Sequence, residues 1–176
     1  MGLCSALNLR AALQHVLVVV RPEAAELTRL FSDQGFEVVA CLGGAEGRGR
    51  SLAAGVAASR HAEGWLVGLA DMPFIGPRTI ASVAMQVLSG AALAAPYYNG
   101  CRGHPVGFGK KLGAELLSLE GDIGAREVLT RHESELVRLE STDRGILTDI
   151  DTPADLTCAQ VWQQTSVSHC SVSDRK

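Results

Sequence analysis

The sequence has no excess of positive charge, no paired-cysteine motif and no long hydrophobic run. Its 16 lysines and arginines are outnumbered by 19 acidic residues, and a net charge of −3 argues against a nucleic-acid partner. The five cysteines form no C-x-x-C pair, so neither a zinc site nor a disulfide framework is indicated. No segment approaches the length of about 20 apolar residues that spans a bilayer. We therefore expect a cytoplasmic protein with reduced thiols and no membrane partner.

What the sequence does contain is enough apolar residues for a core. The chain has 176 residues, of which 47% are hydrophobic and 20% are charged, a composition typical of a globular protein. This length is most simply one domain, which we expect to cover residues 1–163. The polar, serine-containing segment 164–176 is expected to be a disordered tail.

Strand and helix patterns alternate along the chain, which is the signature of an α/β layer fold. Apolar runs predict strands at 15–20, 36–42, 65–70, 91–96, 106–108, 135–139 and 146–150. Capping residues and prolines predict helices at 22–34, 52–61, 77–88, 123–132 and 153–163, with Ser51 and Asp122 as N-caps of the second and fourth. We therefore expect a mostly parallel sheet covered by helices.

An acidic residue ends the predicted strand at 65–70. The segment 64–75 reads Gly-Trp-Leu-Val-Gly-Leu-Ala-Asp-Met-Pro-Phe-Ile, so Asp71 follows an uncharged apolar run and Pro73 turns the chain. Ligands of open α/β sheets bind at the carboxyl ends of the strands. Asp71 is therefore a candidate metal or substrate ligand. The alternative is that it only stabilises the turn, as Asp often does near Pro.

A second apolar segment also runs into acidic residues. Residues 145–156 read Gly-Ile-Leu-Thr-Asp-Ile-Asp-Thr-Pro-Ala-Asp-Leu, and Asp149 and Asp151 share a face if the chain is extended. Either Thr152 or Asp151 can cap the helix that follows. Two acidic strand ends in one chain indicate the two sides of a Mg²⁺ site, because Mg²⁺ is held by one or two carboxylates together with phosphate oxygens and water.

Four motifs occur together and in order. They are Leu-Ala-Asp-Met-Pro-Phe-Ile at 69–75, Arg-Gly-His-Pro-Val at 102–106, Gly-Asp-Ile-Gly-Ala-Arg at 121–126 and Thr-Asp-Ile-Asp-Thr-Pro-Ala-Asp-Leu at 148–156. This set resembles the MobA-like NTP transferases, and specifically their molybdenum cofactor cytidylyltransferase branch, over roughly residues 8–160. The resemblance implies a Rossmann-like, three-layer nucleotidyltransferase fold. It also implies transfer of CMP from CTP to the phosphate of the molybdenum-pterin cofactor, with release of pyrophosphate.

The resemblance assigns roles to individual residues. Asp71 and Asp151 would be catalytic ligands of Mg²⁺, with Asp149 as a second choice for the latter. The residues implied on the nucleotide side are Gly49, Ser51, Leu69 and Ala70. Those implied on the acceptor side are Arg102, His104, Pro105, Asp122 and Arg126. A molybdoenzyme or its chaperone is the implied protein partner. Taken alone, Asp122 could be a plain helix cap, Arg126 a surface charge and His104 a structural loop residue.

The start of the chain departs from the family pattern. Members of the family open with a strand and a glycine-rich loop that ends in a lysine and cradles the triphosphate, whereas residues 1–15 match neither. Residues 8–14 instead resemble the end of the helix that follows that loop. We therefore expect the first βα unit, about 30 residues, to be absent, leaving strand edges exposed. Two alternatives stay open: a non-catalytic protein that binds or hands over the molybdenum-pterin, and a related transferase using GTP or a sugar-phosphate acceptor.

Overall fold

The computed structural model describes residues 1–42, 47–121, 124–152 and 155. Its helices are α1 Gly2–Ala12, α2 Ala25–Asp33, α3 Arg48–Ala58, α4 Pro77–Leu88, α5 Gly113–Leu117 and α6 Ala125–Arg131. Its strands are β1 Leu17–Val20, β2 Glu37–Ala40, β3 Gly64–Val67, β4 Leu93–Tyr98, β5 Cys101–Arg102, β6 Val106–Gly109 and β7 Leu136–Glu140. Short 3-10 helices occur at Lys110–Leu112, Glu133–Glu135 and Arg144–Leu147. Among the described helices, none is both long and apolar enough to cross a membrane.

The strands form two separate sheets. Strand β1 pairs in parallel with β2, while β3, β6, β4 and β5 follow one another in a second sheet and β7 pairs in parallel with β4. Strand β6 is antiparallel to both β3 and β4. The chain reverses between β4 and β5 at Asn99 and Gly100, which both have positive φ, as a tight hairpin turn requires. The second sheet is therefore mixed, and the predicted parallel order holds only for β1–β2 and β4–β7.

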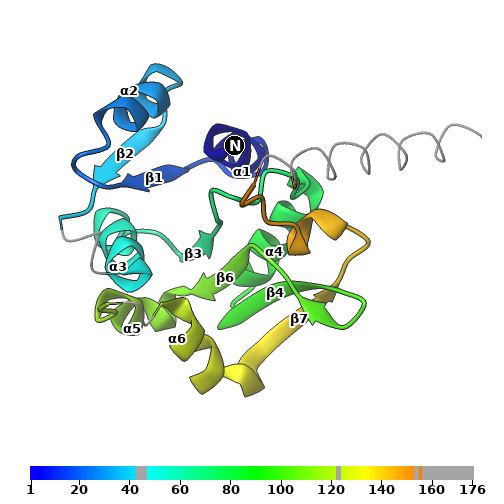
Figure 1. The fold of residues 1–176 in the computed structure, drawn as a ribbon. Coiled ribbons are helices and arrows are strands. Elements are labelled where there is room, and N and C mark those ends of the chain that lie inside the picture. Colours follow the sequence, from blue (N-terminus) through cyan, green and yellow to red (C-terminus); the bar gives the residue numbers. More distant parts are fainter. Residues whose placement is uncertain (43–46, 122–123, 153–154, 156–176) are drawn as a thin grey trace, which may run out of the picture.

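Helices cover both faces of the strands, so the predicted α/β, three-layer architecture is confirmed (Figure 1). On one face, Val83 and Val87 of α4 pack against Ala94 of β4. On the other face, Phe108 of β6 packs in a core that includes Leu116 of α5 and further residues of α3 and α6. Apolar side chains thus alternate between two helical layers, which is why both faces of the strands are apolar.

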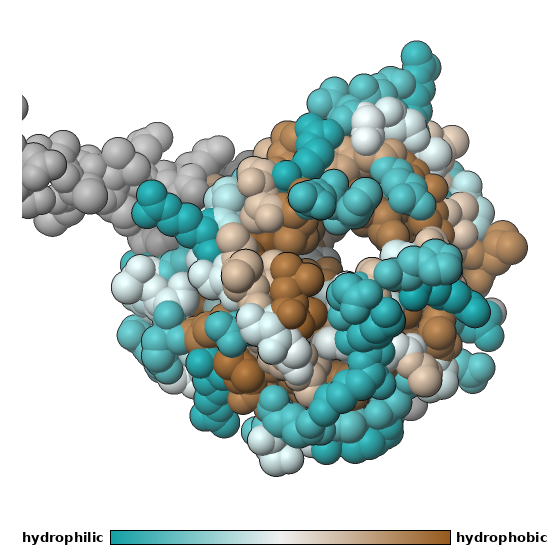
Figure 2. Space-filling model, turned by 180° about the vertical axis from the view of Figure 1, so that it is seen from behind, coloured by the Kyte–Doolittle hydropathy of each residue, from teal (hydrophilic) through white to brown (hydrophobic). Residues whose placement is uncertain are grey.

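The two sheets are separated between β1 and β3. In Figure 1 the strands follow one another across the molecule in the order β2, β1, β3, β6, β4 and β7, with an open space between β1 and β3. The space-filling view from behind shows an opening that passes through the molecule, with hydrophobic surface on part of its rim (Figure 2). The described residues contain no strand between β1 and β3. The exposed strand edges expected from the sequence are thus present.

Several predicted boundaries are wrong. The strand predicted at 146–150 is replaced by the 3-10 helix Arg144–Leu147, because the Asp143 carboxylate accepts a hydrogen bond from the Gly145 amide and bends the chain there. Helix α3 begins at Arg48, so Ser51 lies inside it and is not its N-cap. Helix α6 begins at Ala125 after Gly124. The predicted helix 153–163 and tail 164–176 lie outside the described residues, apart from Asp155.

Candidate active site

The loop after β3, which carries Asp71, is held in place by helix α1. Strand β3 ends at Val67, so Asp71 lies four residues beyond the strand and not directly at its end. The Ser5 hydroxyl donates a hydrogen bond to the Ala70 carbonyl (3.1 Å), and the Asn8 amide nitrogen donates to the Pro73 carbonyl (2.9 Å). The main chain is therefore anchored on both sides of Asp71.

A third anchor comes from the segment 149–151. The Ile150 N–H donates a hydrogen bond to the main-chain carbonyl of Asp71 (2.9 Å). This bond joins the two acidic segments that the sequence analysis expects to form one site. Asp149 and Asp151 flank Ile150, and both are exposed. The structure therefore offers one half-buried carboxylate, Asp71, next to a segment that bears two solvent-accessible ones.

Either Asp151 or Thr152 could act as a helix cap, and the hydrogen bonds of a cap are made by Thr152. The main-chain N–H and the hydroxyl of Thr152 both donate to Asp155 Oδ2 (2.7 and 2.8 Å), and the Asp155 N–H donates back to the Thr152 hydroxyl (3.3 Å). This reciprocal pattern between Thr152 and Asp155 has the form of a capping box. The hydrogen bonds from Thr152 lower the pKa of Asp155. The Asp151 carboxylate takes no part in these three hydrogen bonds.

Two buried polar atoms at this site have no hydrogen-bond partner among the described residues. They are Oδ1 of Asp71 and Nδ1 of His104. A buried polar group without a partner costs about 1–3 kcal/mol, so such atoms indicate a ligand that completes the site. Burial lowers the pKa of His104 below its ordinary value of 6.5 and the Arg102 charge acts in the same direction, whereas a main-chain hydrogen bond at Val67 and the charge of Asp71 oppose them. His104 is therefore a neutral imidazole at pH 7.

The loop between β5 and β6 positions His104 and leaves no room for larger residues before it. The His104 N–H donates to the Ile146 carbonyl (3.0 Å), and the Gly103 N–H donates to the Pro96 carbonyl (2.8 Å). A Cβ on Gly103 would lie 2.5 Å from Ile146, which explains why glycine is found there. Pro105 is fully buried, and Arg102 on β5 is exposed. The motif at 102–106 therefore delivers one half-buried imidazole and one solvent-accessible guanidinium.

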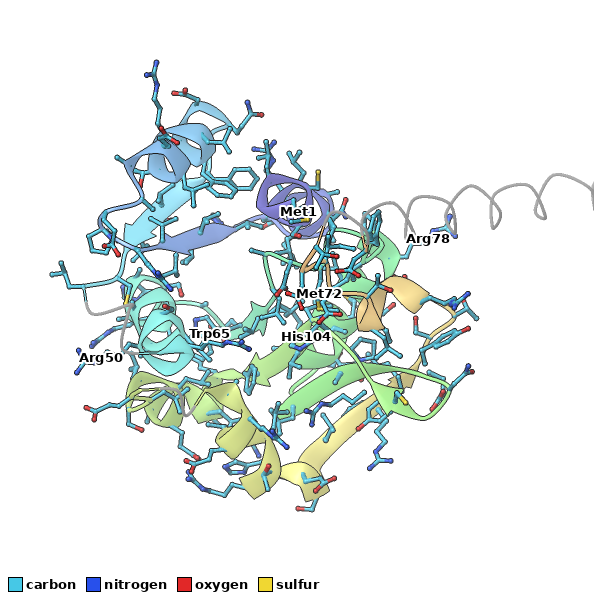
Figure 3. The ribbon with its side chains drawn as sticks, in the orientation of Figure 1. Met1, Arg50, Trp65, Met72, Arg78 and His104 are labelled. Carbon is cyan, nitrogen blue, oxygen red and sulfur yellow. The ribbon has the colours of Figure 1, made fainter. Side chains whose placement is uncertain are left out.

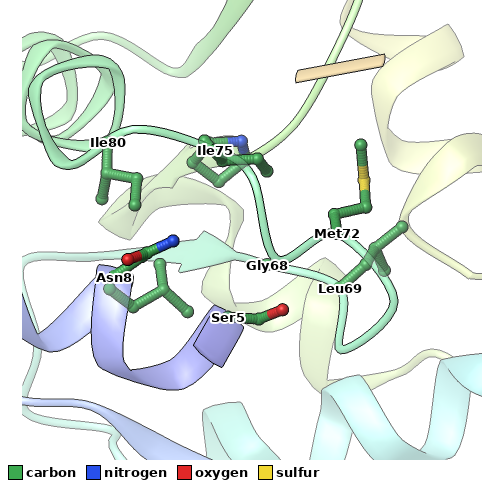
Figure 4. Close-up of a pocket in the computed structure, with 9 residues that line it drawn as sticks. Ser5, Asn8, Gly68, Leu69, Met72, Ile75 and Ile80 are labelled. Atoms are coloured by element: carbon green, nitrogen blue, oxygen red, sulfur yellow. The ribbon is translucent and has the colours of Figure 1, made fainter. Parts of the chain in front are cut away.

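A small hollow lies beside the Asp71 loop (Figure 4). Ser5 and Asn8 of α1 line it together with apolar side chains from the loop and from α4, among them Leu69, Met72 and Ile80. Leu69 was expected to contact the nucleotide, and it does line this hollow. Ala70, the other residue expected there, is exposed. The hollow is mainly apolar and is closed on one side by α1.

The remaining predicted residues lie elsewhere. The Gly49 N–H, expected to face the nucleotide, donates to the Gly121 carbonyl (3.0 Å), which joins the start of α3 to the segment before α6. Arg126 is exposed on α6, and Asp122 lies outside the described residues. Figure 3 places Arg50, on the same turn of α3, well away from His104 and Met72. The structure thus makes two clusters: Asp71 with His104 and the segment 149–151, and Gly49 with Gly121.

The donor set fits a divalent cation of the Mg²⁺ type. The described residues contain no group of three or more His, Cys, Asp or Glu side chains that could hold a metal by themselves. A protein cage of that kind is not needed, because Mg²⁺ is held by one or two carboxylates plus water and substrate phosphate oxygens. The unpartnered Oδ1 of Asp71 is a carboxylate oxygen of the kind that suits this role.

Sequence reasoning missed the residues that hold the site together. Ser5 and Asn8 act on a loop 65 residues away in the chain, and no local pattern signals such contacts. Asp143 is a second omission: its Oδ2 accepts from the Gly76 N–H (2.8 Å) and the Thr79 hydroxyl (2.7 Å) at the start of α4. A local sequence signal existed only for the hairpin between β4 and β5, because Asn-Gly at 99–100 is a dipeptide that strongly favours a tight turn.

Comparison with known families decides the assignment. The sequence profile of the MobA-like NTP transferase domain matches residues 4–136, which is most of the chain. The chain belongs to this family. The matched residues include the Asp71 loop, the 102–106 motif and both anchoring residues of α1. No curated protein matches the sequence.

Solved structures show the same fold at low identity. A nucleotidyl transferase from Methanothermobacter thermautotroptrophicus has a TM-score of 0.76 at 19% identity, with coverage of 93% of this chain and 81% of that one. Rv0371c from Mycobacterium tuberculosis in complex with manganese has a TM-score of 0.65 at 22% identity, with coverage of 90% of this chain and 85% of that one. Molybdopterin-guanine dinucleotide biosynthesis protein A from Archaeoglobus fulgidus has a TM-score of 0.58 at 21% identity, with coverage of 85% of this chain and 78% of that one. At these identities the likeness establishes the fold of the MobA-like domain and nothing more.

Proposed function

We propose that this MobA-like protein transfers CMP from CTP to the terminal phosphate of the molybdenum-pterin cofactor. A phosphate oxygen of the acceptor would attack the α-phosphorus of CTP, and the bond to the bridging oxygen of the β-phosphate would break. Pyrophosphate leaves with that oxygen, so atoms and charges balance. The observation that carries the proposal is the buried, unpartnered Oδ1 of Asp71, beside the neutral His104 and the segment 149–151.

Asp71 and Asp151 would hold Mg²⁺, which when bound neutralises charge on the phosphates and aligns them for in-line displacement. The protein contributes position. Ser5, Asn8 and the Ile150 amide fix the main chain around Asp71, so its carboxylate needs no reorganisation when the nucleotide arrives. This anchoring is what a phosphoryl-transfer site requires, because little covalent chemistry falls to the protein.

The acceptor would lie against the 102–106 motif. Arg102 offers a planar, permanently charged fork that suits a phosphate, and its exposure makes it accessible. His104 is neutral, and because its ring donates a hydrogen bond to the Val67 main chain while Nδ1 has no partner among the described residues, Nδ1 would accept one hydrogen bond from the ligand. Pro105 keeps the loop rigid, and Arg126 would reach the acceptor from α6. A molybdoenzyme or its chaperone would take the product.

One observation favours a second candidate, a non-catalytic protein that binds or hands over the molybdenum-pterin. The Gly49 amide, expected to contact the nucleotide, is engaged by the Gly121 carbonyl. In this arrangement the Gly49 and Ser51 segment presents less backbone to a triphosphate, while the 102–106 motif is intact. A transferase that uses GTP or a sugar phosphate is distinguished from both by substrate choice alone.

Pyrophosphate release tests the proposal. The chain is incubated with Mg²⁺, molybdenum-pterin and either CTP or GTP, and pyrophosphate is measured with a coupled assay. We expect release with CTP that is abolished in Asp71→Asn and retained in Asp149→Asn, a matched substitution in the neighbouring segment. Equal release with GTP would contradict the choice of CTP. Absence of release in a folded protein that still binds the pterin would instead establish the handover candidate.

A further inference from the structure

We infer that His104 is a positioning residue for the divalent cation: its Nδ1 accepts a hydrogen bond from a water molecule on the ion that Asp71 would hold. This role rests on the proposed function, which has Asp71 hold that ion. Asp71 Oδ1 and His104 Nδ1 are both buried and have no hydrogen-bond partner among the described residues. Their segments lie together, because Met72 and Pro105, the residues that follow them, line the same small hollow. Figure 3 shows His104 and Met72 in the same part of the molecule.

The hydrogen bonds of the imidazole determine which of its nitrogens can accept. The ring donates a hydrogen bond to the main chain of Val67, at the end of β3. Because Nδ1 has no partner in the described part of the chain, Nε2 is the nitrogen that donates, and Nδ1 of the neutral ring carries a lone pair and no proton. The main chain is held as well, since the His104 N–H donates to the Ile146 carbonyl (3.0 Å). His104 therefore presents to a ligand an acceptor and no donor.

Asp71 and His104 together require a ligand that donates hydrogen bonds. An ionised carboxylate only accepts hydrogen bonds, so both unpartnered atoms are acceptors. The donors that α1 brings to this loop are already used, because the Ser5 hydroxyl and the Asn8 amide bind main-chain carbonyls. An ionised phosphate also offers only acceptors and would leave Nδ1 of His104 unsatisfied. The acceptor's phosphate is therefore left to Arg102 and does not bind His104.

Water on a divalent cation is the donor that suits both atoms. Mg²⁺ prefers oxygen ligands and keeps several waters, so the Asp71 carboxylate suits direct contact with the ion and the His104 nitrogen suits contact with a bound water. The charge of the ion polarises such a water and makes it a strong donor. Outer partners of this kind orient what the metal binds, and their loss typically weakens metal affinity about 10–100-fold. An N–H or hydroxyl group of the pterin is the other source of a donor, and the test below separates the two.

Two amide variants make the test specific, because asparagine and glutamine replace different nitrogens of histidine. In His104→Asn the amide takes the position of Nδ1 and can accept there, whereas in His104→Gln it lies near Nε2 and keeps the bond to Val67. The affinity for Mn²⁺ is measured by paramagnetic resonance titration without nucleotide or pterin. We expect His104→Asn to stay within about threefold of the wild-type chain and His104→Gln to bind about tenfold or more weakly. A purely structural role of the ring gives the opposite order, since only glutamine keeps the bond to Val67, and would overturn the inference.

A measurement on the wild-type chain does not depend on how the variants fold. Pulsed paramagnetic resonance of the Mn²⁺ complex, with the histidines labelled with ¹⁵N, reports the coupling between the ion and the imidazole. Weak coupling is expected for a nitrogen that is hydrogen-bonded to a bound water. Strong coupling from a direct bond between manganese and nitrogen would contradict the inference, and so would no coupling at all.

The outcomes also separate this role from the proposed function. Mn²⁺ affinity that is lost in Asp71→Asn but equal in the wild-type chain and both His104 variants would refute the role of His104 and leave the metal site intact. Affinity that is unchanged in Asp71→Asn as well would refute both. If His104→Gln binds Mn²⁺ normally and molybdenum-pterin weakly, the hydrogen bond belongs to the pterin and the inference is wrong.

Discussion

At the scale of single residues, the state of His104 follows from its surroundings. Burial lowers its pKa from 6.5, so the folded protein keeps the imidazole neutral at a pH where the unfolded chain is already protonated. Because the pKa of His104 is lower in the folded than in the unfolded chain, its contribution to the free energy of unfolding is fully present above about pH 6.5. That contribution declines as the pH falls below this value. We predict a titration midpoint below 6.5, measured from the ring chemical shifts by NMR. A midpoint at or above 6.5 would contradict the burial of the imidazole ring.

Asp143 shows how one side chain can fix an element. Its two oxygens accept three hydrogen bonds, from the Gly76 and Gly145 main chain and from the Thr79 hydroxyl, and two of the donors lie at the start of α4. We predict that Asp143→Ala lowers the free energy of unfolding by about 2 kcal/mol, as the loss of a helix cap does. Urea titration measures this as a lower midpoint with an unchanged slope. An unchanged midpoint would show that these bonds contribute nothing net.

At the scale of elements, helix α1 is the support of the candidate site. Its Ser5 and Asn8 side chains bind the main chain on both sides of Asp71 without touching the carboxylate. We predict that Ser5→Ala and Asn8→Ala each weaken Mn²⁺ binding by about tenfold, as the loss of outer contacts to a metal ligand does. Paramagnetic resonance titration measures the affinity, and Cys4→Ala, an exposed position on the same helix, is the control. Affinity equal to that of the control would exclude a positioning role for α1.

The elements themselves were largely predictable, and their junctions were not. Apolar runs located β1, β2, β4, β6 and β7, because each strand is covered on at least one face. The run at 146–150 failed because Asp143, outside the run, captures the Gly145 amide and imposes a turn. The Ile150 N–H joins the second acidic segment to the main chain of Asp71. The contacts that hold it there come from residues far away in sequence, which no local pattern reveals.

At the scale of the whole molecule, stability should vary with pH in two directions around pH 6.5. Hydrogen bonds to Glu135 and Glu115 raise the pKa of His132. A raised folded-state pKa contributes stability below about pH 6.5 that is lost as the pH rises through the raised value, opposite in sign to His104. The hydrogen bonds of His132, which follows α6, with these two glutamates link α5 to the 3-10 helix Glu133–Glu135 at the surface.

We therefore predict a maximum of the free energy of unfolding near pH 6.5, measured by urea denaturation across a pH series. The decline above pH 6.5 is expected to be small, because the network is exposed to solvent. The variant His132→Gln should remove that decline and leave the decline at lower pH in place. If the free energy of unfolding of His132→Gln still declines above pH 6.5 as in the wild-type chain, the decline comes from a group other than His132.

The central claim, that this MobA-like fold presents a nucleotide-metal site at Asp71, is tested most directly by calorimetric titration with CTP in the presence of Mg²⁺. The account predicts binding of CTP in preference to GTP that is lost in Asp71→Asn and kept in Asp149→Asn. Binding that is identical in the wild-type chain and in Asp71→Asn would contradict the claim, as would no binding of either nucleotide by folded protein.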